Sequence, residues 1–332
     1  MGVGSVVSVA PIEVVLPTYN GVLYLEAQIT SIHNQTLRPE RVLLRDDGSS
    51  DGTQALITEL QQRYGTWLQV LPADGNLGCT ANVNRLLEAT TAPYVALADQ
   101  DDLWMPEKLE QSHILMQQLE ACHGTIPLLV HSDLELVDLA GKPMGCRYLQ
   151  RQRLDPQRTQ PADLAFTNVV TGCTVLINRA LRDRAMPIPQ QALMHDWWLA
   201  QVASAFGRIE LLPHPTVCYR QHGSNLLGAQ GLDFAYWRQR FAQLVADPAA
   251  GGSMRAVLKQ AAVFEERFEE PLSPSLSLFQ LRRHKRLQPL LRLSAAQRPS
   301  KHGPLRTIGL YLIFIFLSRS VLAVSIETER VQ

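Results

Sequence analysis

The first third of the chain alternates short apolar runs with longer segments of helical periodicity, and no other feature constrains the fold as strongly. Four runs have the length and composition of buried strands: residues 12–16, 42–45, 68–71 and 94–98. Between the first two, apolar residues recur at the spacing of one helix face: Val22, Leu25, Ile29 and Ile32. Further helices are predicted near residues 53–63, 80–89 and 106–119, the last with Pro106 in its first turn. This alternation predicts an α/β fold with a Rossmann-like, mostly parallel central sheet flanked by helices.

The rest of the chain is more mixed, which indicates additions to that core. Strand-like runs at residues 128–130, 134–137 and 174–177 are separated by polar sequence. A helix is predicted at residues 193–206, strands at 209–212 and 217–219, and helical sequence from about 232 to 268. We therefore expect a main domain over residues 1–228, a helical C-terminal extension over 229–280, and a basic and apolar tail over 281–332.

Composition excludes several classes of protein. The 31 basic and 31 acidic residues cancel to a formal net charge of zero, which argues against nucleic acid as a partner. With 46% hydrophobic residues, the chain is globular rather than disordered. The five cysteines are scattered without a CxxC pair, so we expect a reducing compartment and neither a disulfide framework nor a zinc site. We also expect no export signal, because no apolar region of secretory length opens the sequence.

The tail differs from the rest of the chain. Residues 282–306 are rich in Lys and Arg and contain no acid, and residues 308–317 are almost wholly apolar. This pattern predicts a cytoplasmic protein whose tail touches the anionic inner face of the plasma membrane peripherally. The alternative is a buried terminal helix that follows a solvated basic linker.

Polar residues follow the first three predicted strands. Ligands bind at the carboxyl ends of the strands in an open parallel sheet, so these residues are candidates for a nucleotide site. The candidates are Pro17, Thr18, Tyr19 and Asn20, then Asp46 and Asp47, then Asn76, Gly78 and Asn84. Ser50 or Asp51 can instead cap the next helix, and both interpretations can hold together. Taken alone, the segment after the third predicted strand, which contains Asn76 and Gly78, is an ordinary strand-to-helix loop.

The fourth strand exit is the most informative. Asp99, Asp101 and Asp102 follow an apolar strand directly, and three acids this close repel one another unless a cation lies among them. Oxygen ligands suit Mg²⁺ or Mn²⁺, which would bridge a diphosphate and stabilise its charge as it leaves. Acidic turns before helices are common, so the position of these acids at the end of a strand supports a metal site more than their residue pattern does.

Two later segments add candidates. Asp196 stands near the predicted start of a helix beside Trp197, where a carboxylate can act as general base to a hydroxyl. Alternatively, Asp196 only interacts with the helix dipole and the tryptophans are core. After another strand, His222 could complete a metal site and Arg220 could contact phosphate, although a lone loop histidine is more often solvated.

The motifs at 14–21, 45–53, 76–78 and 97–109 appear in the order typical of family 2 glycosyltransferases, and the chain resembles that family. The match continues through residues 168–181, 195–198 and 219–225 and covers roughly 10–228. Within the family, the chain is similar to the bacterial rhamnosyltransferase-like subgroup.

The resemblance implies a GT-A fold, a catalytic domain over 1–228 and an inverting reaction. It implies a nucleotide site at 17–20, Asp46, Asp47 and Asp99, a metal at Asp99 and Asp101, and Asp196 as base. Asp102 has no assigned role. Gly172, Trp197 and Arg220 would face the acceptor or the phosphates. His195 departs from the Glu that many relatives carry before the base.

The predicted function is therefore the transfer of a sugar, with rhamnose suggested by the subgroup, from a dTDP- or UDP-sugar to a saccharide or lipid-linked acceptor. Cell-surface polysaccharide biosynthesis is the expected pathway. A sugar-nucleotide nucleotidyltransferase is the nearest alternative, but it would carry a Gly-rich, basic phosphate loop after the first strand. A dinucleotide-dependent oxidoreductase lacks its G-x-G-x-x-G motif here. A non-catalytic carbohydrate-binding protein would not need the acids at 99, 101 and 196.

Overall fold

The computed structural model describes residues 8–73, 75–221 and 252–268 of the chain. The chain divides into two compact units. The first comprises Met1–Gln152 and Val170–Ala229, and the second comprises Arg153–Val169 and Gln230–Gln332. Residues 153–169 thus group with the C-terminal part of the chain, whereas the predicted main domain runs unbroken to residue 228. That predicted boundary lies outside the described residues.

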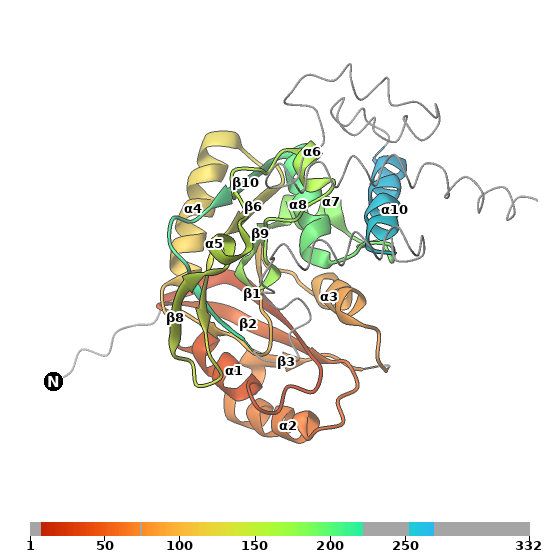
Figure 1. The fold of residues 1–332 in the computed structure, drawn as a ribbon. Coiled ribbons are helices and arrows are strands. Elements are labelled where there is room, and N and C mark those ends of the chain that lie inside the picture. The colour runs from red at the N-terminus through yellow and green to blue at the C-terminus, as the bar shows by residue number, and fades with distance from the viewer. Residues whose placement is uncertain (1–7, 74, 222–251, 269–332) are drawn as a thin grey trace, which may run out of the picture. The chain divides into compact units, whose positions relative to one another are not determined.

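A seven-stranded sheet forms the centre of the first unit, with strand order β10-β6-β9-β4-β1-β2-β3 (Figure 1). Its strands are β1 (Ser8–Thr18), β2 (Leu37–Asp46), β3 (Leu68–Val70), β4 (Tyr94–Leu97), β6 (Leu128–His131), β9 (Leu176–Asn178) and β10 (Arg208–Leu211). All neighbouring pairs are parallel except those of β9, which runs antiparallel to β4 and β6. The predicted α/β fold with a mostly parallel central sheet is confirmed.

Helices cover both faces of this sheet (Figure 1). On one face, alternate residues of β1 share an apolar cluster with α1 (Leu25–His33) and α4 (Lys108–His123). On the other face, α3 (Cys79–Glu88) contacts β1, and α8 (His195–Phe206) contacts β6 and β10. Apolar cover on both sides explains why the strands are rich in Val, Ile and Leu. The unit also contains α2 (Thr53–Tyr64), α5 (Tyr148–Gln152), α7 (Arg179–Ala185) and the 3-10 turns η1 (Gly65–Trp67) and η2 (Gly172–Thr174).

The register brings the carboxyl ends of β1, β2 and β4 to one edge of the sheet. Thr18 at the end of β1 pairs with Asp46 at the end of β2. On the other side of β1, the N–H of Ala98 donates to the carbonyl of Val15 over 3.0 Å, one residue beyond β4. Three of the predicted strand exits therefore meet at the edge where open parallel sheets bind ligands.

A second, four-stranded sheet has the order β5-β11-β7-β8. Its strands are β5 (Leu103–Trp104), β11 (Val217–Arg220), β7 (Leu134–Val137) and β8 (Pro143–Arg147). The runs at 134–137 and 217–219 were predicted as strands, whereas β5 and β8 were not. Because β5 follows the acidic residues directly, Asp99 to Asp102 span the gap between β4 in one sheet and β5 in the other.

Most predicted helices and strands are present, with two local corrections. The helix α4 begins at Lys108, so Pro106 lies before the helix rather than in its first turn. The carbonyl of Pro106 accepts the N–H of Thr36 over 2.9 Å instead. The predicted strand at 174–177 begins too early, because residues 172–174 form η2 and only residues 176–178 join the sheet as β9.

The described part of the second unit contains α6 (Pro161–Leu164) and α10 (Gly252–Arg267). The helix α10 confirms the end of the helical stretch predicted at 232–268, and residues 232–251 lie outside the described residues. The basic and apolar tail also lies outside them. Among the helices that the structure describes, none has the length and apolar character needed to cross a membrane.

Candidate active site

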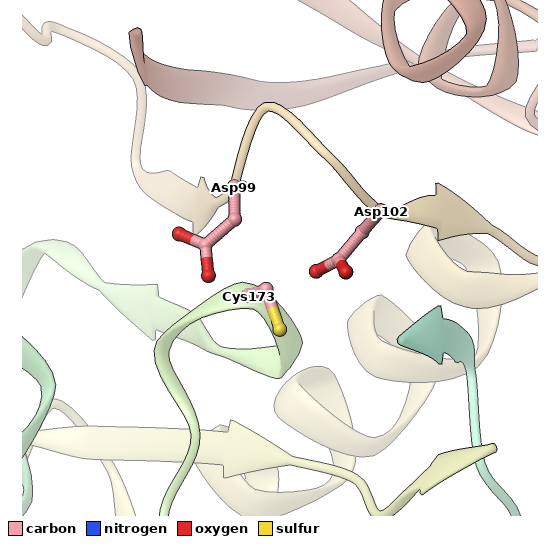
Figure 2. A group of neighbouring side chains, drawn as sticks. All are labelled: Asp99, Asp102 and Cys173. Carbon is pink, nitrogen blue, oxygen red and sulfur yellow. The ribbon is translucent and has the colours of Figure 1, made fainter. Parts of the chain in front are cut away.

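The acidic loop, defined as Asp99–Asp102, connects the end of β4 to β5. Figure 2 shows the carboxylates of Asp99 and Asp102 beneath this loop, together with the thiol of Cys173 from η2. Each of these three side chains has one potential ligand atom, and the three atoms all lie within 4.8 Å of one another. The fold therefore gathers a compact group of candidate metal ligands at the carboxyl edge of the sheet.

Asp102 lacks ordinary partners. This residue is 1% exposed, and neither of its carboxylate oxygens has a hydrogen bond of normal geometry to any described residue. Removing an ionised carboxylate from water costs several kcal/mol unless another group compensates its charge. A hard divalent cation between Asp99 and Asp102 would supply that compensation, and carboxylate oxygens are the ligands that Mg²⁺ and Mn²⁺ prefer. The sequence assigned the cation to Asp99 and Asp101, whereas the structure groups Asp102 with Asp99, so the orphaned oxygens of Asp102 are additional candidate ligands.

Burial and neighbouring negative charges raise the pKa values of the acids in this cluster and of the nearby Cys79. Burial, followed by the charges of Asp101 and Asp196, raises the pKa of Asp99 to about 7. Burial and the charges of Asp99 and Asp101 hold the pKa of Asp102 well above its ordinary value, although the Cys173 thiol and the backbone N–H of Arg220 oppose the shift. Burial and the charge of Asp99 also raise the pKa of the Cys79 thiol, to about 12. Burial is the largest cause of each shift, and the repulsion between the acids adds to it, which a bound cation would relieve.

Lys108 is buried close enough to Asp102 to feel its charge, but it forms no direct ion pair with the acidic loop. Its Nζ donates to the carbonyl of Thr174 over 2.9 Å and lies 4.5 Å from the ring centroid of Trp104. Burial lowers the pKa of Lys108 to about 8, although the charges of Cys173 and Asp102 oppose that shift. Burial raises the pKa of the Cys173 thiol well above its ordinary value. A protonated thiol is a poor ligand for Mg²⁺ or Mn²⁺, so the carboxylates are the better candidates.

Asp196 occupies the first turn of α8, as predicted, and is 7% exposed. Its Oδ2 accepts the backbone N–H of Gly172 over 3.0 Å, and its Oδ1 accepts the N–H of Trp197 over 2.6 Å. Burial raises the pKa of Asp196 to about 6, although these N–H groups oppose the shift. Each oxygen keeps a further lone pair, so the carboxylate can still accept a proton from a hydroxyl group. A carboxylate with a pKa near neutrality has the properties of a general base.

Gly172 allows η2 to pack closely against the start of α8. A Cβ at this position would lie 2.9 Å from Nε2 of His195 and 3.6 Å from Oδ2 of Asp196. His195 is 4% exposed, so its ring has little room to move. We predict that Gly172→Ala lowers the free energy of unfolding by about 1–3 kcal/mol, the usual cost of overpacking. Urea denaturation of the two proteins measures this difference.

A double variant separates this crowding from other effects of the added methyl group. His195→Ala removes the ring that the new Cβ would meet, so the combined Gly172→Ala and His195→Ala protein should lose less stability than the two single variants added together. If the losses are additive, the crowding explanation is wrong.

The β1 exit loop, defined as Pro17–Gly21, contacts the acidic loop through Gln100. The Oε1 of Gln100 accepts the Thr18 hydroxyl over 2.5 Å and the Tyr19 N–H over 2.9 Å, and its Nε2 donates to the Tyr19 carbonyl over 2.9 Å. Asn20 is exposed, and Tyr19 is 50% exposed. The structure thus brings two predicted sites together and leaves these side chains accessible to a ligand.

Asp46 and Asp47 are both buried, and both bind groups within the protein. Asp46 accepts the backbone N–H of Ser49 over 2.9 Å and also its hydroxyl group. Asp47 accepts the guanidinium of Arg45 over 2.9 Å and the backbone N–H of Gly78 over 2.8 Å. Asp47 therefore holds the third strand exit against the second. These bonds give both acids a role in shaping the site, whether or not they touch a ligand.

Asn76 and Asn84 also have partners within the protein. The side-chain oxygen of Asn76 accepts the N–H of Gly78 over 3.2 Å, so it shapes its own loop. The amide of Asn84 donates to Glu88 over 2.8 Å and accepts the N–H of Ile188 over 2.7 Å. Both ends of the Asn84 amide are used in this way, and its predicted contact with a nucleotide stays a prediction.

Arg220, the last residue of β11, binds the backbone of the acidic loop. Its Nε donates to the carbonyl of Asp101 over 3.2 Å, and its Nη1 donates to the carbonyl of Leu139 over 2.7 Å. Trp197 is half-buried and meets Asp196 through its backbone. The remaining predicted ligand, His222, lies outside the described residues.

Sequence reasoning assigned no role to Gln100, Lys108 or Cys173, which complete the site. Gln100 stands between two acids, and that position was the one available signal for it. Lys108 falls within a predicted helix, where most lysines are exposed, so nothing in the sequence indicates its burial. Cys173 follows the predicted site residue Gly172, but a lone cysteine carries no signal of its own.

Comparison with known proteins gives independent information. Residues 13–128 match the model of Glycosyl transferase family 2. The chain is 26% identical over 230 residues to the dTDP-rhamnosyl transferase RfbG of Shigella flexneri. That alignment covers 64% of this chain and 74% of RfbG. It is 28% identical over 170 residues to the putative teichuronic acid biosynthesis glycosyltransferase TuaG of Bacillus subtilis. That match covers 51% of this chain and 62% of TuaG.

Solved structures share the fold. The chain aligns with residues 1–349 of S. aureus TarS in complex with UDP-GlcNAc at a TM-score of 0.51 and 14% identity, over 86% of this chain and 87% of that one. The complex of TarS 1–349 with UDP aligns at a TM-score of 0.51 and 16% identity, over 84% and 88% of the two chains. At these identities the likeness concerns the fold alone.

Proposed function

We propose that this chain, a glycosyltransferase whose residues 13–128 match glycosyl transferase family 2 and whose fold is that of GT-A enzymes, moves a sugar from a nucleoside-diphosphate sugar to an acceptor hydroxyl with inversion. The proposed acceptor is a saccharide or lipid-linked glycan in cell-surface polysaccharide biosynthesis. The names of RfbG and TuaG support rhamnose, dTDP and this pathway. The UDP complexes of TarS support a nucleotide donor.

One observation carries the proposal. The carboxylates of Asp99 and Asp102 group with the thiol of Cys173 at the carboxyl edge of the sheet, and the buried Asp196 accepts the N–H of Gly172, the residue before Cys173. The charge of Asp196 helps to raise the pKa of Asp99, which indicates that the two groups are close. Displacement at a sugar phosphate requires a cation to stabilise the leaving phosphate and a base to take the proton of the attacking hydroxyl. The acids here would supply the cation site, and Asp196, whose pKa is about 6, would supply the base.

The acidic loop would hold the divalent cation, Mg²⁺ or Mn²⁺. Asp99, Asp101 and Asp102 supply the oxygens, with Asp102 as the buried member. When bound, such an ion supplies positive charge that stabilises a diphosphate leaving group. Arg220 and Gln100 would keep the loop in place, since they bind the Asp101 carbonyl and the Tyr19 backbone.

Asp196 would act as the base. Its carboxylate takes the proton of the acceptor hydroxyl as that oxygen bonds to the anomeric carbon from the face opposite the phosphate. The bond between the anomeric carbon and the phosphate oxygen breaks, and the nucleoside diphosphate leaves with the electron pair. The N–H groups of Gly172 and Trp197 hold the carboxylate in one orientation for this transfer.

The β1 exit loop would contact the nucleotide. Tyr19 and Asn20 present exposed side chains beside the acidic loop, so a base or ribose there would lie next to the diphosphate. Asp46, Asp47 and Asn76 would support this surface from behind through the bonds described above. We place the reaction on the cytoplasmic side of the membrane, with support from the basic sequence at 282–306.

A panel of dTDP-, UDP- and GDP-sugars tests the proposal. The full-length protein is incubated with each donor, Mn²⁺ or Mg²⁺, and a membrane fraction as acceptor source, and released nucleotide and glycosylated product are measured. We expect dTDP-rhamnose to be consumed fastest, with a product of inverted anomeric configuration by NMR. A control with Asp183→Asn, which removes an exposed acid paired with the buried Arg182, should keep full activity.

The alternatives give different results in the same assay. A nucleotidyltransferase would release pyrophosphate from a nucleoside triphosphate and a sugar phosphate, and a carbohydrate-binding protein would bind glycans without consuming any donor. If no donor is consumed, or if the product keeps the anomeric configuration of the donor, the proposed reaction is wrong.

A further inference from the structure

We infer that Gln100 couples the β1 exit loop to the acidic loop, so that a nucleoside and a divalent cation bind cooperatively even when no phosphate joins them. This inference rests on the proposed function, because it concerns the same two binding regions. Gln100 is a positioning residue, since it acts through Tyr19 and through the acids on either side of it.

The amide of Gln100 meets the backbone of one residue in the β1 exit loop from both sides. Its Oε1 accepts the Tyr19 N–H over 2.9 Å, and its Nε2 donates to the Tyr19 carbonyl over 2.9 Å. The Thr18 hydroxyl donates to the same Oε1 over 2.5 Å. Reversing the amide would set its NH₂ group against the Tyr19 N–H, so these bonds determine its orientation. The pairing resembles one rung of a β-ladder made by a side chain.

The position of Gln100 in the chain turns this pairing into a connection. Asp99 and Asp101 are its immediate neighbours, so a shift of its backbone moves both carboxylates. The carbonyl of Asp99 also accepts Nε2 of the buried Gln28 over 2.9 Å. Gln28 belongs to α1, which begins four residues after the β1 exit loop ends. The acidic loop is therefore held at two points by the segment that follows β1.

Gly21 leaves the space that the Gln100 amide needs. A Cβ on Gly21 would collide with Oε1 of Gln100 and would lie 2.7 Å from its Cδ and 3.0 Å from Oγ1 of Thr18. Any side chain at Gly21 must therefore displace the Gln100 amide or the loop itself. This contact offers a second route to break the connection while Gln100 itself stays unchanged.

Binding at either region should then favour binding at the other. A nucleoside that orders Tyr19 would hold Gln100, and through it the positions of Asp99 and Asp101. Such coupling is reciprocal, because the cation must raise the affinity for the nucleoside by the same factor. We expect a coupling factor of about 5 or more, the lower end of the usual range for coupled sites.

Isothermal titration calorimetry on the full-length protein tests the inference. The affinity for Mn²⁺ is measured with and without saturating uridine or thymidine, which carry no phosphate and so cannot bridge to the ion. UDP and dTDP are titrated in parallel as probes of nucleotide binding itself. We expect the nucleosides to raise the Mn²⁺ affinity about 5-fold in the natural protein and not measurably in Gln100→Ala.

Two further variants complete the design. Gly21→Ala should also abolish the nucleoside effect, and it carries the test if circular dichroism shows Gln100→Ala to be unfolded. Gln69→Ala removes an exposed glutamine on β3 that binds Arg41, and it should keep the full coupling. An equal nucleoside effect in all of these proteins, or none in the natural protein, overturns the inference while the proposed function stands. If the natural protein binds neither Mn²⁺ nor any nucleotide, the proposed function itself is wrong.

Discussion

Replacing Asp196 with asparagine is expected to reduce sugar transfer by about 10²–10⁴-fold, the usual contribution of a general base. The amide keeps the size of the carboxylate but cannot take the proton of the acceptor hydroxyl. The loss should appear in kcat, measured with saturating donor and Mn²⁺, because the proton moves in the transition state rather than in ground-state binding.

The pH dependence gives this prediction a second readout. Burial raises the pKa of Asp196 to about 6, and the base works only when it is ionised. With saturating Mn²⁺, the value of kcat/KM in the natural protein should therefore fall as the pH drops through about 6. The residual activity of Asp196→Asn should lack this acidic limb.

The fold of this variant needs its own control. Both carboxylate oxygens of Asp196 accept backbone N–H groups, whereas asparagine must turn its NH₂ toward one of them. Some loss of thermal stability is therefore expected, and circular dichroism with a melting curve must show a folded protein at the assay temperature. Near-normal transfer by the folded variant would remove Asp196 from the base role.

Replacing Asp99 with asparagine is expected to raise the melting temperature of the metal-free protein while it lowers transfer by about 10²–10³-fold. The raised pKa of Asp99, about 7 against an ordinary 3.8, means that its ionised form costs native stability. Removing that charge stabilises the fold most above pH 7, and the gain disappears below about pH 3.8. The loss of activity corresponds to several kcal/mol of charge stabilisation by the cation.

Thermal melts with and without Mn²⁺ separate the two effects. A ligand that binds only the folded protein stabilises it by about 2.7 kcal/mol at 100 times its dissociation constant, so Mn²⁺ should raise the melting temperature of the natural protein. Asp99→Asn should lose that rise, and Asp183→Asn should keep it. An unchanged response of Asp99→Asn to Mn²⁺ would falsify the role of Asp99 as a ligand.

The other two acids of the loop test which carboxylate accompanies Asp99. We expect Asp101→Asn and Asp102→Asn both to lose part of the response to Mn²⁺. Of these two variants, only Asp102→Asn should also raise the metal-free melting temperature, because burial and the charges of Asp99 and Asp101 hold the pKa of Asp102 well above its ordinary value, whereas Asp101 is partly exposed. A full response to Mn²⁺ in Asp102→Asn would show that its orphaned oxygens have another purpose.

The sequence by itself determined the helices and strands of the first hundred or so residues and predicted where the site lies, but it did not predict β5, β8, α5 or α7. The strands β1 to β4 and the helices α1 to α4 follow from apolar periodicity, which is a local property of the chain. The parallel arrangement of β1, β2 and β4 places their carboxyl ends at one edge, which is why the sequence predicts that Tyr19, Asp46 and Asp99 lie together. Asp196 was placed correctly at a helix N-terminus by the same kind of reasoning.

Only the tertiary structure decided how these residues meet. Periodicity assigns side chains to faces within an element, but it does not determine their directions within a loop of four residues. In the folded chain Asp102 lies near Asp99, and Gln100 pairs with Tyr19 across 81 residues of chain. The bond between Asp196 and Gly172 likewise depends on η2 folding against α8. Such contacts arise from the packing of distant segments, and no local pattern of residue types encodes them.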